Sequence, residues 1–406
     1  MELDDFCVLC KRVLDAHYKI IESAILKGNV SANGRAIDHV YYPTTILCIE
    51  SEGGILSVEL LGLTKVRKSL RVKKRKNTFG KRFALVDIKK DTGKSIFTVG
   101  RRNGASKILF SDSESMSFYR SQGNYFGGKF GTHISLGEDL DYLVGVNEDS
   151  ESFILSECML SYMSNNVYRT RYINKMIIFN SKLSEMEITI ELDYFINTKS
   201  QINTGGVFGV YSFPDEEALS WVKASYLMNL FLNDKIHETT IGDYLNEHPD
   251  ILLCALGYKD MVYEPSLKWM EKTTDNTDSF INPDALLKRM DGYYDICDFK
   301  KGLMRRKSLT KGERRRRRFI DDVNEGLAQL DNYEEYFKFE KNSQHALERY
   351  SVEVNVPKKI LIIGNVENIN QDEVEQALRG RHNTLVVDYD SLISGYMGAI
   401  KGFEQK

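Results

Sequence analysis

Two aspartates and a lysine stand close together in the segment 282–300, and their types suggest chemistry on a phosphate ester. Asp284 begins one short apolar stretch, and Asp298 and Lys300 end the next. Because side chains alternate across a strand, Asp298 and Lys300 share a face while Phe299 points the other way, into a core. Two carboxylates and an ammonium group are what a hard divalent cation and a water nucleophile need for phosphodiester hydrolysis.

A tight turn must bring these groups together. The dipeptide Asp291-Gly292 separates the two stretches and favours a tight hairpin turn. A hairpin of this length returns Asp298 to the neighbourhood of Asp284. We therefore predict Asp284 and Asp298 as metal ligands, with Lys300 placed to orient the attacking water and to stabilise negative charge on the phosphate. The alternative is that all three are ordinary turn and surface residues.

A third carboxylate is predicted from the helix that precedes the hairpin. In the segment 236–247, Glu238 lies on the same side as Ile241 and Leu245, so it borders an apolar face that turns inward. Glu238 is therefore the preferred third ligand, and Glu247 at the end of the helix is the alternative.

Positive charge is clustered in two runs, although the formal net charge is only −3. The first run leaves the predicted catalytic strand directly and enters a helix predicted over about 313–337. A phosphate-binding strip there would hold a duplex backbone against the metal site. To this contact we assign Lys301, Arg305, Arg306, Lys307, Arg314, Arg315 and Arg316. The second run, 65–82, either binds nucleic acid or anchors a regulatory contact, and a solvated surface is the alternative for both.

The motif Pro283-Asp284 with Asp298-Phe299-Lys300 resembles that of PD-(D/E)xK nucleases, with Asp at 298 where many have Glu. Further blocks follow in order: Glu238-Thr-Thr-Ile-Gly-Asp-Tyr-Leu245, Gln329-Leu-Asp-Asn-Tyr333, Pro357-Lys-Lys-Ile-Leu-Ile-Ile-Gly364 and Val387-Asp-Tyr-Asp390. Over residues 216–406 this set resembles the C-terminal domain of the Shedu family of bacterial anti-phage defence nucleases.

The resemblance implies a restriction-endonuclease-like fold and Mg²⁺-dependent cleavage of invading DNA, with Mn²⁺ as a possible substitute. It also implies a homo-oligomer, in particular a tetramer. Gln329 shares a helix face with Tyr333, and in related nucleases a glutamine from this helix approaches the active site. Here the resemblance assigns Gln329 a hydrogen bond near the metal or the phosphate.

The fold class follows from how the pattern changes along the chain. A helix is predicted over 6–27, then a β-rich region of one or two subdomains up to residue 215, with strands at 44–47, 55–58, 83–86, 176–179 and 186–193. Residues 216–406 alternate helices with strands, which favours an α/β nuclease domain with a mixed sheet. We therefore predict an α+β multidomain protein with a regulatory or recognition region at 1–215.

The composition indicates the class of protein and its location in the cell. The chain of 406 residues is 42% hydrophobic and 28% charged, which is typical of a globular protein. No stretch has the length of a membrane span or the pattern of a signal peptide, so a cytoplasmic location without membrane partners is expected. Cys7 and Cys10 form an isolated Cys-x-x-Cys, and free thiols are favoured over a redox or metal pair.

Two other functions remain open on the sequence. One is a nucleic-acid-binding sensor whose nuclease fold is catalytically silent. The other is an RNA-cleaving nuclease, because no residue can be assigned to reading the ribose hydroxyl. The glycine pairs do not form a phosphate-binding loop ending in Gly-Lys-Ser or Gly-Lys-Thr, so a nucleotide-hydrolysing motor is excluded.

Overall fold

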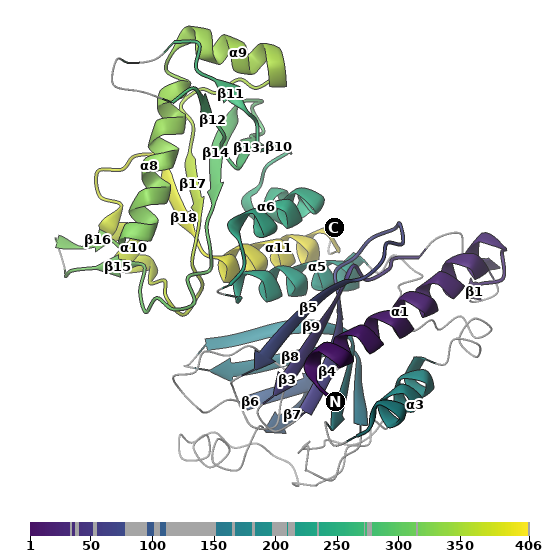
Figure 1. Cartoon of the computed structure of the whole chain (residues 1–406). Helices are drawn as coiled ribbons and strands as arrows, with labels where there is room; N and C mark the ends of the chain where they lie inside the picture. Colours follow the sequence, from purple (N-terminus) through teal and green to yellow (C-terminus); the bar gives the residue numbers. More distant parts are fainter. Residues whose placement is uncertain are drawn as a thin grey trace. The chain divides into compact units, whose positions relative to one another are not determined.

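The chain divides into two compact units, Met1–Tyr226 and Leu227–Lys406, in the computed structural model (Figure 1). The division falls inside helix α5 (Glu216–Phe231), after the boundary predicted at residue 215. The structure describes residues 1–32, 35–36, 40–51, 55–77, 96–100, 106–110, 152–164, 167–180, 183–196, 209, 216–233, 235–271, 273, 278–313 and 316–404.

The first unit is built on a seven-stranded sheet in the order β5-β3-β4-β9-β8-β6-β7. Neighbouring strands are antiparallel except β3 and β5, which are parallel. The β-rich character predicted for this half of the chain is therefore confirmed. The strands are β3 (Thr45–Ser51), β4 (Ile55–Leu61), β5 (Arg71–Asn77), β6 (Ile96–Gly100), β7 (Ser106–Phe110), β8 (Ser152–Ser164) and β9 (Val167–Asn180), and β1 (Ser31–Ala32) pairs separately with β2 (Arg35–Ala36).

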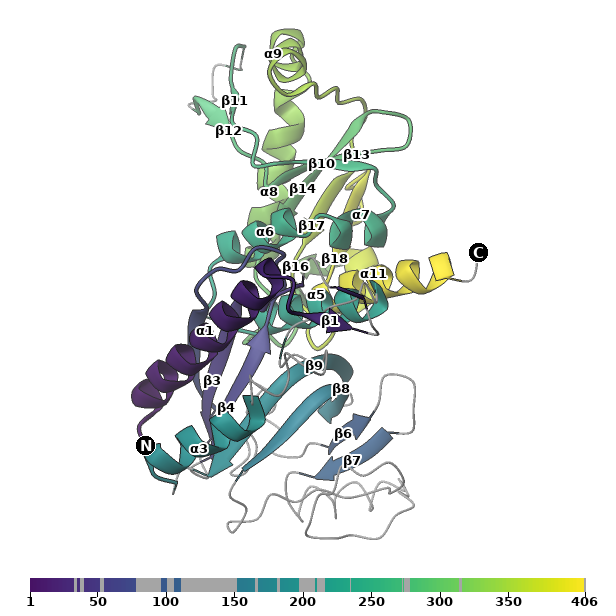
Figure 2. The same cartoon turned by 90° about the vertical axis from the view of Figure 1, so that its right-hand side faces the viewer.

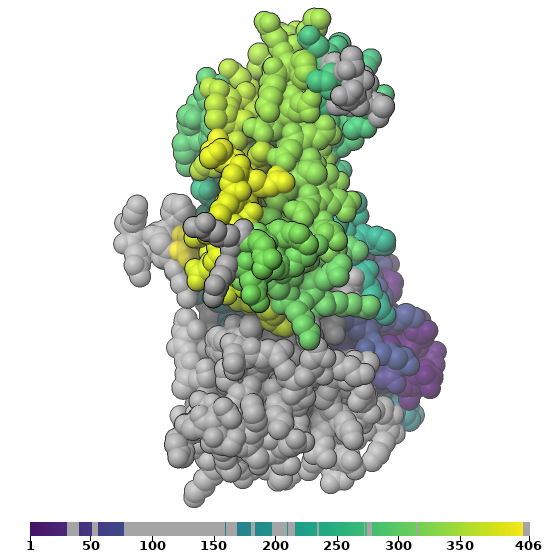
Figure 3. All heavy atoms as spheres, turned by 90° about the vertical axis from the view of Figure 1, so that its left-hand side faces the viewer, coloured from purple at the N-terminus to yellow at the C-terminus, as the bar shows by residue number. Residues whose placement is uncertain are grey.

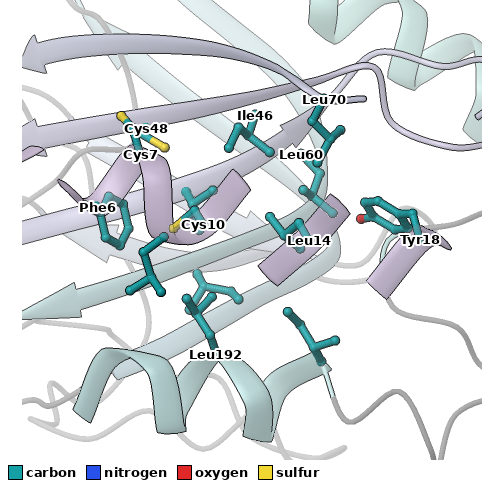
Figure 4. Packing of buried hydrophobic residues seen from close by; sticks show 14 of the residues in the cluster. Phe6, Cys7, Cys10, Leu14, Tyr18, Ile46, Cys48, Leu60, Leu70 and Leu192 are labelled. Atoms are coloured by element: carbon teal, nitrogen blue, oxygen red, sulfur yellow. The ribbon is translucent and has the colours of Figure 1, made fainter. Parts of the chain in front are cut away.

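Helix α1 (Leu3–Leu26) and helix α3 (Glu185–Ile196) pack together, and α1 covers β3, β4 and β5 (Figure 2). Its buried side recurs every three or four residues, as an amphipathic helix requires, through Phe6, Cys10, Leu14, Tyr18 and Ile21 (Figure 4). These side chains form one core with alternate residues of β3 and β4 and with Leu192 of α3.

The cysteines of this core behave as apolar filling. Cys7, Cys10 and Cys48 are buried free thiols, and the hydrogen bond to Cys48 together with burial raises the pKa of the Cys7 thiol far above its ordinary value. A thiol that resists ionisation is a poor nucleophile and a poor metal ligand.

The strand predicted at 186–193 is wrong, because this segment forms helix α3. Its β-branched residues suggested a strand, but Ile188, Leu192 and Ile196 recur every fourth residue and are all buried. Ser184 and Glu187 also form a capping box, in which the Ser184 hydroxyl accepts from the Glu187 N–H and the Glu187 carboxylate accepts from the Ser184 N–H. The strand predicted at 83–86 lies outside the described residues.

The second unit has a five-stranded mixed sheet in the order β10-β13-β14-β17-β18. The first three strands are antiparallel, and β14, β17 and β18 are parallel. The predicted hairpin is confirmed, with Gly292 at φ 100° in its turn. The strands are β10 (Asp260–Tyr263), β13 (Ala285–Lys288), β14 (Tyr294–Phe299), β17 (Lys359–Ile362) and β18 (Thr384–Val387), and β11 (Leu267–Lys268) pairs separately with β12 (Phe280–Ile281).

Helices cover both faces of this sheet, with α8 on one side and α6 and α7 on the other (Figure 1, Figure 2). Tyr294 and Ile296 of β14 pack into one core with Leu327 and Leu330 of α8. The helices are α6 (Glu238–Glu247), α7 (Asp250–Leu256), α8 (Asp321–Tyr336), α9 (Glu340–Tyr350), α10 (Gln371–Ala377) and α11 (Tyr389–Glu404). No helix in the described ranges is both long enough and apolar enough to cross a membrane.

The predicted start of the long helix at about residue 313 is wrong. Helix α8 begins at Asp321, and the residues before it form a small hairpin of β15 (Thr310–Lys311) and β16 (Arg318–Phe319). Asp321 and Asp322 occupy the first turn of α8, where negative charge is favourable and arginines would oppose the helix dipole. Of the described arginines in the run, Arg318 lies in β16, and Arg316 and Arg317 precede that strand.

Candidate active site

The hairpin of β13 and β14 brings Asp284 and Asp298 together. Its ladder ends with the pair Ala285 and Cys297. Asp284 stands one residue before this end, and its Oδ2 accepts a hydrogen bond of 2.6 Å from the Phe299 N–H. The Asp284 carboxyl group also hydrogen-bonds the side chain of Asp298. The contact expected between these two carboxyl groups is therefore present.

Lys300 follows the last residue of β14 and completes the cluster. Its Nζ lies 2.7 Å from Asp298 Oδ2 and 3.9 Å from Glu238 Oε2. The Asp298 side chain is only 2% exposed and the Lys300 side chain 16%, so the ion pair is shielded from water. The structure brings together Asp284, Asp298, Lys300 and Glu238, as the sequence predicts.

The pKa values of Asp284 and Asp298 are raised, chiefly by burial. Burial, followed by the charge of Asp298, raises the pKa of Asp284 to about 7. Burial also raises the pKa of Asp298, although Lys300 opposes the change. For Lys300, burial lowers the pKa, but the charge and hydrogen bond of Asp298 outweigh it and leave the pKa raised. Both carboxyl groups therefore resist ionisation, and the lysine stays charged.

Helix α6 approaches the face of β14 that carries Phe299, opposite to the face that carries Asp298 and Lys300. Glu238 is the first residue of this helix. A Cβ on Gly242 would lie 2.8 Å from the Tyr263 hydroxyl, which would have to move, and 3.6 Å from the Phe299 ring, which is an ordinary contact. Glu238 is one turn before Gly242, and its side chain is 42% exposed. Glu247, the alternative, is exposed at the far end of the helix.

Helix α8 covers the face of β14 that carries Asp298 and Lys300. A Cβ on Gly326 would lie 2.7 Å from Leu361 Cδ1 and 3.4 Å from Lys300 Cε. Tyr333, two turns further along α8, is close enough that burial and then the charges of Asp298 and Asp284 raise its pKa. Gly326, Gln329 and Tyr333 share this side of the helix.

Gln329 lies on α8 between Gly326 and Tyr333. Its Oε1 is buried and finds no hydrogen-bond donor within the described part of the chain. A buried amide oxygen without a donor is costly unless a water or ligand satisfies it. This observation agrees with the role predicted for Gln329 and leaves that role a prediction.

Gly242 and Gly326 were not identified from the sequence, although a glycine inside a helix costs about 1 kcal/mol relative to alanine and so suggests a close approach. We expect Gly326→Ala to clash with Leu361 and so to shift α8 where it covers Lys300, which should lower cleavage activity about tenfold, with a net stability loss of about 1 kcal/mol after the gain in helix propensity. The matched control is Ala328→Gly on the exposed side of α8, which should cost similar stability and keep activity. Thermal melts and initial rates measure both, and equal activity losses in the two variants would contradict the packing argument.

The segment after Lys300 is fixed by backbone contacts. The Lys300 N–H donates to the Ile362 carbonyl over 2.8 Å, and the Tyr389 hydroxyl donates to the Lys300 carbonyl. Asn365 and Asn368 both donate side-chain hydrogen bonds to the Gly302 carbonyl. The backbone that carries Lys300 is therefore held on both sides, which fixes where its ammonium group can lie.

The predicted phosphate contacts have different surroundings. Arg305, Lys307 and Arg316 are exposed, and Lys301 is half-buried. Arg306 makes an ion pair of 2.8 Å with Asp322 at the start of α8. Arg314 and Arg315 lie outside the described residues. In the second basic run, Lys74 and Lys76 of β5 pair with Asp4 and Glu50, respectively.

The residues present fit a cation held by two carboxylates. Asp284 and Asp298 contact each other and resist ionisation together, and a divalent cation would relieve this repulsion. Glu238 Oε2 lies 3.9 Å from Lys300 Nζ, and the structure does not support its predicted role as a third ligand. Within the described ranges, no group of three or more acidic, histidine or cysteine side chains is arranged to hold a metal.

Comparison with known proteins gives little. No protein-family model and no curated protein matches the chain. Protein VC1899 from Vibrio cholerae is similar at 13% identity and a TM-score of 0.19, over 55% of this chain and 45% of its own, so the chain spans less than half of that protein.

Two further solved structures are endonucleases by name. A repair endonuclease from Pyrococcus abyssi has 9% identity and a TM-score of 0.17 over 73% of this chain and 84% of its own. EndoMS in complex with double-stranded DNA has 9% identity and a TM-score of 0.16 over 73% and 83%. Similarities this low assign no residue a role, and the resemblance to the Shedu family stays a prediction.

Proposed function

We propose that the unit Leu227–Lys406 is a metal-dependent nuclease that hydrolyses phosphodiester bonds of DNA. The observation that carries the proposal is the cluster of Asp284, Asp298 and Lys300 at the end of one hairpin, with an ion pair of 2.7 Å and two acids that resist ionisation. Perturbed acids beside a fixed cation are characteristic of catalytic sites.

Each residue then has a defined task. Asp284 and Asp298 would hold Mg²⁺, with Mn²⁺ as a substitute, and the bound cation would supply a Lewis acid for the phosphoryl oxygen and for water. Lys300 offers three donors to the attacking water and to the developing negative charge. Glu238, predicted as a third ligand, lies 3.9 Å from the ammonium group instead, and Gln329 would offer its unsatisfied oxygen to a water.

The biological setting rests on the resemblance. A member of the Shedu family would act in the cytoplasm against phage DNA, as a homotetramer, with the N-terminal unit recognising DNA or restraining the nuclease. Such an enzyme must spare the host DNA, so its activity must be gated. These statements belong to the proposal and await a measured activity.

The decisive test is cleavage by the purified full chain. Supercoiled, nicked and linear DNA and a matched RNA are incubated with Mg²⁺ or with EDTA. We expect DNA cleavage only with Mg²⁺, and none by the double variant Asp298→Ala/Lys300→Ala. Equal cleavage by wild type and double variant would overturn the assignment, and a preference for RNA would favour the RNA-cleaving alternative.

One observation favours a catalytically silent sensor as the second candidate. The ammonium group of Lys300 lies 2.7 Å from Asp298 Oδ2, an oxygen that a cation would need, and no three-residue ligand group is arranged in the described ranges. A sensor would bind DNA with the same affinity in Mg²⁺ and in EDTA and would leave every substrate intact. Any Mg²⁺-dependent cleavage that Asp298→Ala removes would exclude it.

Metal affinity should depend on pH, because a carboxyl group must lose its proton to bind a cation. With the Asp284 pKa raised to about 7, we expect Mg²⁺ affinity to fall up to about tenfold for each pH unit below 7 and to level off above 8. Calorimetric titration of the DNA-free protein in buffers of different ionisation enthalpy should show close to one proton released per ion at pH 6. An affinity independent of pH would contradict the perturbed pair.

A further inference from the structure

We propose that the paired strands β15 and β16, with residues 309–313 and 316–319, are a pre-positioned arm that grips the backbone of duplex DNA. Its grip depends on a contact between Arg317 and Glu373 of α10. The proposal rests on the proposed function and deepens it, since it names a duplex backbone as what the arm holds. Binding can nevertheless be measured without cleavage. We call residues 309–313 and 316–319 the basic arm, and the contact of Arg317 with Glu373 the tie.

The base of the arm is built into the core of the second unit. Thr310 pairs with Phe319 and Lys311 with Arg318. Leu309 and Phe319 are buried, and their segments are joined by the hydrogen bond from the Ile320 N–H to the Leu309 carbonyl. The Leu309 N–H also donates to the Asn368 carbonyl. The arm therefore cannot swing freely at its base.

One arginine of the run is used inside the protein. Arg317 Nη1 lies 2.6 Å from Glu373 Oε1, and the Thr310 hydroxyl donates to Glu373 Oε2. Arg317 Nη1 also donates to the Thr310 hydroxyl over 3.4 Å. The Arg317 side chain is 17% exposed and that of Glu373 28%. These three side chains tie both strands of the arm to the first turn of α10, where the N-cap Asn370 fixes the position of Glu373.

The neighbours of Arg317 differ from it in burial. Arg316 and Arg318 are exposed, whereas Arg317 is partly buried in its contacts with Glu373 and Thr310. The arm lies beside α10 at the N-terminal end of α8 (Figure 1), and the green atoms of this part of the chain lie at the surface in Figure 3. The tie thus fixes the direction in which two guanidinium groups are presented.

The chemistry of the arm favours a duplex backbone over a single strand. Exposed guanidinium groups match phosphate oxygens, and exposed Arg305 and Lys307 extend the positive surface toward Lys300 along the chain. Proteins that hold single strands add aromatic side chains on which bases stack. The one aromatic residue of the basic arm, Phe319, is buried. A rigid cationic hairpin without a stacking surface suits the regular phosphate spacing of a duplex.

The test uses a substitution for which charge and geometry predict opposite results. Glu373→Ala removes a negative charge beside the arm, so electrostatics alone predicts tighter DNA binding. If the tie positions the arm, binding should instead weaken about five- to tenfold because a loose arm must be ordered on binding. The matched control is Glu375→Ala, an exposed glutamate on the same helix, which changes the charge equally and leaves the tie intact.

Binding of the full chain to a labelled DNA duplex is followed by fluorescence anisotropy in EDTA at several salt concentrations. Arg316→Ala/Arg318→Ala should weaken binding and reduce the salt slope by about 2. Arg317→Lys keeps the charge, but its Nζ is one bond short of the position of Arg317 Nη1, which contacts both Glu373 and Thr310, so it should behave like Glu373→Ala. If Glu373→Ala and Arg317→Lys bind as tightly as Glu375→Ala while thermal melts show folded protein, the proposal is overturned.

Duplex RNA and single-stranded DNA serve as competitors. We expect both to compete at least fivefold less well than duplex DNA, and equal competition would refute the choice of ligand. These readouts need no catalysis. If the binding results are as expected but no DNA is cleaved in Mg²⁺, the nuclease proposal fails and the proposed arm stands. If DNA is cleaved but Glu373→Ala leaves binding unaltered, the proposed arm fails and the nuclease proposal stands.

Discussion

Replacing Asp298 with asparagine is expected to lower the rate of Mg²⁺-dependent DNA cleavage by a factor of at least about 10³. Asp298 is 1% exposed, contacts Asp284 and lies 2.7 Å from Lys300 Nζ. The neutral amide has nearly the same shape but cannot hold a cation with comparable strength, and it leaves the ammonium group of Lys300 without its buried partner. Relaxation of supercoiled plasmid under single-turnover conditions measures the loss.

The control is Asp260→Asn in β10 of the same sheet. Asp260 is exposed, and its carboxylate accepts a hydrogen bond only from the neighbouring Met261 N–H among the described residues. Its replacement should leave the cleavage rate within about twofold of wild type, as surface substitutions usually do. If Asp298→Asn keeps more than about a tenth of the activity while melting at the wild-type temperature or above, the metal-dependent mechanism is wrong.

The centre of this site could be predicted because its geometry is short-range. Asp291-Gly292 specifies the turn, and alternation along one strand decides that Asp298 and Lys300 share a face. Helical periodicity likewise selected Glu238, which lies 3.9 Å from Lys300, over Glu247. Each inference needed fewer than about twenty neighbouring residues, a range over which turn and periodicity rules apply.

The surroundings of the site depend on long-range packing, which a single sequence does not encode in a local pattern. Gly326 touches Lys300 only because α8 lies across β14 and β17. The contact of Arg317 with Glu373 joins segments far apart in the chain. A local pattern cannot show such a contact, so the sequence predicts that the arginine run begins a helix. The wrong prediction for helix α3 has a local cause. The β-branched residues of this segment favour a strand, and this signal conceals the capping box of Ser184 and Glu187, which favours the start of a helix.

Active sites often cost stability, and this one should do so through its acids. A carboxyl group whose pKa is raised by folding destabilises the native state once it ionises. Asp284, with its pKa raised to about 7 chiefly by burial, binds a proton more tightly in the folded than in the unfolded chain. Between about pH 4 and pH 7 the native state therefore holds more protons than the unfolded state, and stability falls as pH rises through this window.

Asp284→Asn should consequently stabilise the metal-free protein while abolishing cleavage. The raised pKa sets an upper limit of about 4 kcal/mol on the gain at pH 8, and we expect about 1–3 kcal/mol because the coupled Asp298 can take up part of the charge. The side-chain carbonyl that the substitution introduces can still accept from the Phe299 N–H, so the hairpin end is kept. Denaturant titrations at pH 8 and pH 4.5 measure the gain, which should be largest at pH 8 and small at pH 4.5.

The control is Asp291→Asn in the turn of the same hairpin. Asp291 is exposed. Desolvation raises its pKa, but the hydrogen bonds from Arg289 and the Tyr293 N–H and the charge of Arg289 together outweigh it and leave the pKa lowered. An acid of this kind stabilises the native state when ionised, so the sign is reversed and Asp291→Asn should slightly destabilise the protein at pH 8. Saturating Mg²⁺ should stabilise the wild type but not Asp284→Asn, because a ligand that binds only the folded state raises its stability. A loss of stability in Asp284→Asn at pH 8 would mean that the ionised acids do not destabilise the metal-free native state. The raised pKa of Asp284 would then be wrong, and with it the expected gain from binding a cation.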